Sequence, residues 1–171
     1  VLRSALIARA LPVSFAISTG NEAVNGVEDF LEAVLDDPIT GAVVMVVEQF
    51  ADPPKFLALA RRAREAGKPV LLLHPGRSAA ARASAASHTG KLAGDHALMR
   101  CQVEAEGVIL ADALDELIDC ADILTRCKSR PRGGCAVVTD SGVFKAQTLD
   151  LADQTGLVLP HLAPATIAAL R

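Results

Sequence analysis

The chain has 171 residues, of which 51% are hydrophobic, 22% charged and 3% aromatic, and it carries a formal net charge of −3. This profile is typical of a globular protein with an aliphatic core, and it provides neither the basic field nor the aromatic platforms that nucleic-acid binding uses. No apolar run is long enough to span a bilayer and no signal peptide is evident, so we expect a cytoplasmic protein without membrane contacts.

Apolar periodicity and turn residues predict helices and strands that alternate along the chain. In chain order the expected elements are a helix at 1–10, a strand at 13–18, a helix at 27–35, a strand at 41–47, a helix at 53–66, a strand at 69–73, a helix at 93–106, a strand at 108–110, a helix at 114–126, a strand at 135–139, a helix at 144–155, a strand at 157–159 and a helical tail from residue 164. Asn25 is the expected cap of the second helix, with Glu28 three residues further on. The apolar run at 41–47 predicts a strand that is buried on both faces of a parallel sheet.

This alternation predicts an α/β fold, a doubly wound parallel sheet whose strands all end at one edge, where ligands bind. The chain opens on a helix and stops soon after a second α/β unit begins, so we expect a fragment truncated at both ends. The expected organisation is one domain over 1–128, a linker at 129–134 and the start of a second domain at 135–171. The first sheet would then lack a strand, and we hypothesise that residues 135–139 fill that place.

The four cysteines, Cys101, Cys120, Cys127 and Cys135, show no CxxC spacing. They are interpreted as reduced and mostly buried small side chains of an intracellular protein. We therefore expect no metal site.

Glu48 follows seven apolar residues and is therefore expected at the carboxyl end of a buried strand. A carboxylate at that position points into the ligand crevice of a parallel sheet. A solvated strand end explains the same position equally well, so the residue's role stays open at this level.

His88 lies in a loop of small residues between a strand and a helix, and it is a candidate phosphoryl acceptor. Ser87 and Thr89 can cap the helix start and Gly90 allows close backbone approach, which together make an anion site. The neutral imidazole would attack phosphorus, and a carboxylate such as Glu48 would fix its tautomer and stabilise the developing positive charge. An ordinary capping turn with a surface histidine is the alternative interpretation, and it is favoured on local pattern alone.

Other polar residues near the expected strand ends carry weaker signals. Arg77 can meet phosphate or be simply solvated, and Gly20 and Asn21 can form a pocket wall or only a turn. His74 ends a strand and can contact a ligand, whereas His96 is expected to be structural or exposed within a helix.

Taken together, ordered blocks along the chain resemble the NDP-forming acyl-CoA synthetases, relatives of succinyl-CoA synthetase. The blocks are Ser18-Thr19-Gly20-Asn21-Glu22-Ala23, Asp36-Asp37-Pro38-Ile39-Thr40, Glu48, Lys68-Pro69-Val70, Gly76-Arg77-Ser78, Ala85-Ala86-Ser87-His88-Thr89-Gly90-Lys91-Leu92-Ala93-Gly94, Gly107-Val108-Ile109 and Asp115-Glu116-Leu117-Ile118-Asp119. The resemblance covers residues 1 to about 128 as a flavodoxin-like ligase domain, and residues 133–171 resemble the start of the next domain.

The resemblance implies that His88 is the phosphohistidine and that Glu48 positions it, while Ser87, Thr89, Gly90, Gly20, Asn21 and Arg77 bind phosphate or CoA. It implies synthesis of acyl-CoA from a carboxylic acid, CoA and ATP with Mg, through an acyl phosphate and a mobile phosphohistidine loop. The partners implied are a CoA-binding domain and an ATP-grasp domain or subunit, both outside this chain, so the isolated chain is expected to be inactive and to bind no cofactor tightly. Whether the protein forms a homo-oligomer stays open.

The chain departs from the family pattern at Val24, His74 and Gln49, and in the turn at 141–144. These departures leave the acid unassigned and do not touch His88 or Glu48. Two other interpretations remain: a non-catalytic regulatory module like those fused to acetyltransferases, which usually lack the histidine, and a purely structural interaction domain.

Overall fold

The computed structural model describes residues 1–20, 22–81, 96–127, 129 and 134–170. The chain divides into two compact units, 1–128 and 129–171, and each is described by itself. None of the helices described in either unit is both long and apolar enough to cross a bilayer.

The first unit is built on a parallel sheet of three strands in the order β1-β2-β3. The strands are β1 (Val43–Val46), β2 (Val70–Leu73) and β3 (Ile109–Ala111). Both neighbouring pairs are parallel: Val43 to Val46 lie opposite Val70 to Leu73, and Leu71 to Leu73 lie opposite Ile109 to Ala111. The predicted parallel sheet is therefore confirmed.

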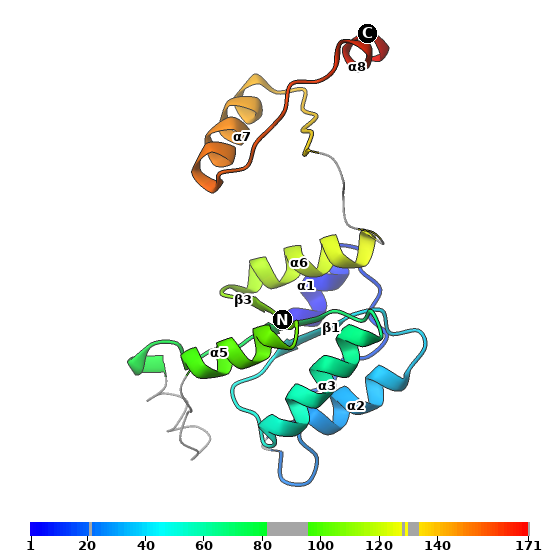
Figure 1. The fold of residues 1–171 in the computed structure, drawn as a ribbon, viewed down its shortest axis with the longest axis vertical. Helices are drawn as coiled ribbons and strands as arrows, with labels where there is room; N and C mark the ends of the chain where they lie inside the picture. Colours follow the sequence, from blue (N-terminus) through cyan, green and yellow to red (C-terminus); the bar gives the residue numbers. More distant parts are fainter. Residues whose placement is uncertain (21, 82–95, 128, 130–133, 171) are drawn as a thin grey trace. The chain divides into compact units, whose positions relative to one another are not determined.

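Helices cover both faces of this sheet (Figure 1). On one face lie α2 (Val27–Asp36), α3 (Pro53–Glu65) and α5 (His96–Ala105), and on the other lie α1 (Leu2–Ala8) and α6 (Leu114–Arg126). The central strand shows why: Val70 and Leu72 are buried in the cluster under α2, α3 and α5, whereas Leu71 is buried in the cluster under α1 and α6. Successive side chains of a strand point to opposite faces, so an unbroken apolar run requires a helix layer on each side.

Among the residues that the structure describes, three of the expected strands are absent, two of which bear on the first sheet. Residues 13–18 form no strand, although their apolar pattern predicts one. Residues 135–139 form no strand either, which contradicts the hypothesis that they complete the sheet. A strand needs a neighbour to accept its backbone hydrogen bonds, and an apolar pattern contains no record of that neighbour.

The predicted burial of the run at 41–47 on both faces is met only in part by β1, where Met45 is buried in one cluster and Val44 packs against the other. The β2 side chains from Val70 to Leu72 are all buried, because β2 is the central strand and helices cover both of its faces. Val46 of β1 is 48% exposed, because β1 is an edge strand of the described sheet.

The second unit contains α7 (Gly142–Thr155) and α8 (Pro164–Ala169). Ser141 caps α7 by accepting the amide of Phe144, and Gly156 ends it with φ +68°. The expected strand at 157–159 is absent.

The cysteine expectation is wrong on burial. Cys101, Cys127 and Cys135 are exposed and Cys120 is half-buried, and all four are free thiols. Cys101 lies on the solvent side of α5, and Cys127 just past the end of α6, because the two helices turn other side chains toward the core. Within the described residues, no group of three or more His, Cys, Asp or Glu side chains is arranged to hold a metal ion.

Candidate functional site

Polar side chains follow all three strands at the carboxyl edge of the sheet. Glu48 comes two residues after β1, His74 directly follows β2 and Asp112 directly follows β3. Because the strands are parallel, these positions lie at the same edge. This is the edge where doubly wound sheets bind their ligands.

Glu48 is exposed at this edge. Its carboxylate makes no hydrogen bond or ion pair with any residue that the structure describes, so both oxygens are available to a ligand or to a side chain brought to the edge. The predicted partner, His88, lies outside the described residues, as do Ser87, Thr89, Gly90 and Asn21. The pairing of Glu48 with His88 therefore stays a prediction.

The described residues beside Asn21, Gly20 and Glu22, have unusual backbone. Gly20 has φ +62° and Glu22 has φ +52°, so both residues have left-handed backbone. Thr19 donates its hydroxyl to Glu22 Oε1 at 2.8 Å. Such backbone suits glycine because the left-handed region carries no steric penalty for it.

Residues 47–52, the segment that carries Glu48, contact the end of β2 through His74. The Nδ1 atom of His74 lies 2.7 Å from the carbonyl oxygen of Val47, and its ring is stacked on Phe50 at 5.9 Å and 7°. Phe50 in turn contacts the buried Phe56 with ring centroids 4.2 Å apart. A carbonyl can only accept, so Nδ1 carries the proton and, in the neutral ring, Nε2 keeps its lone pair.

The imidazole of His74 is held neutral. Burial lowers its pKa below the ordinary histidine value, and the nearby His96 lowers the pKa further, although the bond to the Val47 carbonyl opposes the shift. The two imidazole rings lie 5.5 Å apart. His74 therefore presents an uncharged ring at neutral pH.

The same segment is attached to α2 through Glu28, a residue that sequence reasoning treated only as part of a helix cap. Gly26, not Asn25, is the residue before α2, and Asp29 accepts the Gly26 amide at 2.9 Å. Glu28 instead turns inward, where it is 2% exposed and accepts the amide of Asp52 at 3.0 Å. No sequence signal distinguishes this buried glutamate from a solvated one, because the first turn of many helices is acidic.

A cavity of about 270 Å³ opens at the ends of β2 and β3, beside α5. Arg77 lines it, and its Nη1 lies 3.4 Å from Asp112 Oδ2; Arg100 Nη1 lies 3.2 Å from the other carboxylate oxygen of Asp112. His74 and His96 complete this wall. Arg77 is thus at the expected edge, while Arg100, Asp112 and His96 are neighbours that the sequence did not assign to the site.

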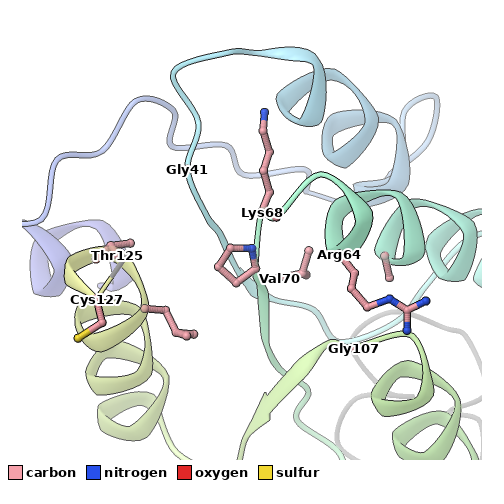
Figure 2. Close-up of a pocket in the computed structure, with 11 residues that line it drawn as sticks. Gly41, Arg64, Lys68, Val70, Gly107, Thr125 and Cys127 are labelled. Carbon is pink, nitrogen blue, oxygen red and sulfur yellow. The ribbon is translucent and has the colours of Figure 1, made fainter. Parts of the chain in front are cut away.

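A larger cavity of about 570 Å³ lies at the opposite, amino edge of the sheet (Figure 2). Lys68, in its wall, reaches the end of α2, where its Nζ donates to the carbonyls of Leu35 at 2.8 Å and Asp37 at 2.6 Å. Arg64 donates to the carbonyl of Ala105 at 3.3 Å. These cations bind carbonyls at helix ends, and the cavity lies at the edge of the sheet opposite Glu48 and His74, so we do not assign it to the candidate site.

Comparison with known proteins gives a family and several relatives. A family model described as the succinyl-CoA ligase like flavodoxin domain matches residues 1–124. A trans-feruloyl-CoA synthase of an unknown prokaryotic organism is 48% identical over 171 residues, which is 100% of this chain and 24% of that protein. The ADP-forming acetate–CoA ligase I of Archaeoglobus fulgidus is 34% identical over 92% of this chain and 23% of its own length.

A solved structure shares the fold. The Ca. Korarchaeum cryptofilum acetyl-coenzyme A synthetase 1, in complex with phosphate and ADP, superimposes with a TM-score of 0.74 at 27% identity, over 89% of this chain and 33% of that one. The chain spans about a quarter of the length of the two curated relatives named above.

Proposed function

The chain belongs to the family of succinyl-CoA ligase-like flavodoxin domains, and from this premise we propose that it is the phosphoryl-carrying domain of an NDP-forming acyl-CoA synthetase. The relatives named above are CoA ligases or synthetases, including an ADP-forming one. Because the chain corresponds to only part of them, a CoA-binding part and an ATP-grasp part, in the same polypeptide or in separate subunits, complete the machinery.

The proposed reaction makes acyl-CoA in three transfers. A ring nitrogen of His88 attacks the γ-phosphorus of Mg-ATP, a P–N bond forms, and ADP leaves. An oxygen of the acid's carboxylate then attacks that phosphorus, which gives an acyl phosphate and regenerates the imidazole. Finally the CoA thiolate attacks the acyl carbon, and inorganic phosphate leaves with the electrons of the broken C–O bond. The cycle runs in the opposite direction to make ATP.

Glu48 carries the argument from the structure. It is a carboxylate at the ligand edge of a parallel sheet, exposed and without a partner among the residues described. A carboxylate that accepts the second N–H of His88 fixes the tautomer that attacks phosphorus and stabilises the positive charge of the phosphohistidine. The sequence block around His88 matches the family that uses such a histidine.

The surrounding residues supply the anion site. Ser87, Thr89 and Gly90 offer hydroxyl and backbone donors on the His88 loop. Gly20 has left-handed backbone, Asn21 follows it in the sequence, and Arg77 lies beyond the end of β2, where its guanidinium can meet phosphate oxygens of CoA or of the phosphoryl group. The chain alone is not expected to hold CoA or nucleotide tightly.

The test is phosphoryl transfer from ATP labelled in the γ-phosphate to the protein that joins this chain with its CoA-binding and ATP-grasp parts. Wild type should take up one acid-labile, alkali-stable label, and His88→Ala should take up none. Glu48→Gln should slow uptake by about a hundredfold, on the order seen when a group that orients a catalytic base is neutralised. Glu65→Gln, which removes an exposed carboxylate of α3, is the matched control and should behave as wild type.

The outcomes separate the proposal from its alternative. If His88→Ala incorporates as much label as wild type, the phosphohistidine is wrong. If wild type takes up no label while binding CoA or an acyl-CoA, the chain is a non-catalytic binding module. Release of acyl-CoA from ATP, CoA and either trans-ferulate or acetate, the acids in the names of two relatives, would assign the substrate.

A further inference from the structure

We propose that Glu28 and His74 are positioning residues that hold residues 47–52 and, through this segment, set the place of the Glu48 carboxylate. The inference rests on the proposed function, because it assigns Glu48 a partner at the ligand edge. It adds two residues from other elements, α2 and the end of β2, to the machinery of that site.

Glu28 is the first anchor. It is the only charged side chain that is buried among the described residues, at 2% exposure. A buried carboxylate is costly unless hydrogen bonds replace its water, and its Oε1 accepts the Asp52 amide at 3.0 Å. The contact joins the start of α2 to the residue that caps α3, at the far end of the segment. An apolar side chain would fill the same space with a smaller desolvation cost, so we attribute the presence of a carboxylate to its hydrogen bond and not to packing.

Gly26 preserves the space that Glu28 needs. A Cβ atom at Gly26 would lie 2.6 Å from Glu28 Oε2 and 3.4 Å from the Cβ of Ala51. Its φ of −90° is open to any residue, so the reason for glycine here is close approach and not backbone conformation. The carboxylate is thus enclosed between the helix start and the segment that it holds.

His74 is the second anchor, and it contacts the segment on both sides of Glu48. Its Nδ1–H donates to the carbonyl of Val47, one residue before Glu48, and its ring stacks on Phe50, two residues after. The backbone of Glu48 is therefore bracketed by contacts to one imidazole. A carboxylate held in this way keeps its direction while both of its oxygens remain available, and catalysis is sensitive to displacements of about 1 Å.

The test is a double-mutant cycle on the rate of label transfer to His88 in the assembled enzyme. Glu28→Leu should slow transfer by about tenfold or more, and Glu28→Gln, which keeps an oxygen acceptor for the Asp52 amide, should recover most of that loss. In the Glu48→Gln background, Glu28→Leu should change the rate by less than about twofold, because the group that it positions has already been neutralised. A merely structural role would slow transfer equally in both backgrounds, and that result would overturn the proposal.

His74 is tested in the same cycle with two complementary substitutions. His74→Asn keeps a donor near the Nδ1 position and loses the ring, whereas His74→Phe keeps the ring and loses the donor. Both should slow transfer in the wild-type background, and neither should do so after Glu48→Gln. Equal slowing in the two backgrounds would remove His74 from the proposal.

A second readout is independent of catalysis. Hydrogen exchange of the Asp52 amide in the 171-residue chain should accelerate at least tenfold in Glu28→Leu and in Gly26→Ala, and much less in Glu28→Gln. Unchanged exchange in Glu28→Leu would refute the anchor even if the enzyme is active. Absence of label on wild-type His88 would instead refute the proposed function, so the two failures are distinguishable.

Discussion

His74 Nδ1 lies 2.7 Å from the carbonyl oxygen of Val47, so the end of β2 is bonded to the end of β1 beyond the last ladder hydrogen bond between them. The bond requires a proton on Nδ1, and burial together with the neighbouring His96 keeps the second nitrogen unprotonated by lowering the pKa of the ring. The carboxyl edge is therefore organised around a neutral imidazole whose tautomer is fixed.

The lowered pKa of His74 predicts a loss of stability in mild acid. The folded state binds this proton less tightly than the unfolded state, whose histidine has the ordinary value of 6.5. The contribution is therefore fully present above pH 6.5 and is lost as the pH falls from there through the folded-state pKa. Urea unfolding between pH 7.5 and 5 should show the decline, followed by far-ultraviolet circular dichroism because the chain has no Trp or Tyr.

The control for this prediction is His74→Phe, which keeps an aromatic ring and cannot titrate. Its free energy of unfolding should vary less with pH over the same window. Identical pH dependence in both proteins would show that other groups are responsible.

Gly107→Ala should destabilise the first unit more than Gly67→Ala. Both glycines follow a helix with left-handed backbone, at φ +86° and +68°, and an L residue there costs on the order of 1–2 kcal/mol. A Cβ at Gly107 would in addition lie 2.8 Å from Arg64 Cδ, whereas nothing lies within 4 Å of a Cβ at Gly67. Chemical denaturation of both variants measures the difference, and an equal loss would contradict the steric part of the argument.

Lys68→Met should also destabilise this unit. The Lys68 ammonium donates to two carbonyls at the end of α2, and a hydrogen bond from a charged group contributes about 1.5–3 kcal/mol. Methionine keeps the length of the side chain and removes the donor. We expect a loss of about 2 kcal/mol in urea unfolding.

The comparison for Lys68 is Lys145→Met on α7. Lys145 is exposed in the second unit and its ammonium makes no hydrogen bond or ion pair with the described residues, so its replacement should change the free energy of unfolding by less than about 0.5 kcal/mol. Similar losses in the two variants would show that removal of a positive charge, and not of the two carbonyl contacts, accounts for the change in the free energy of unfolding.

Strongly periodic segments were predictable from the sequence because their patterns match the period of the element. The helix at 114–126 has the bounds expected, and β2 and α3 differ by one residue at one end. The strand at 13–18 was not predictable in the same way, because an apolar pattern describes one strand and says nothing of the neighbour with which it would pair. The cysteines were misjudged for a related reason, since burial depends on which face of a helix meets the sheet.

For the candidate site, residue types and their spacing establish that Glu48 follows a core strand, that the Ser87-His88-Thr89-Gly90 block comes between β2 and α5 in the sequence, and that the whole resembles one family of ligases. These are local properties of spacing and residue type. Only the tertiary structure decided that Glu28 is buried against the Asp52 amide and that His74 bonds to Val47, because these pairs are 24 and 27 residues apart in the chain. Contacts between distant elements arise from how helices and strands pack, and that packing is not recorded in any single segment.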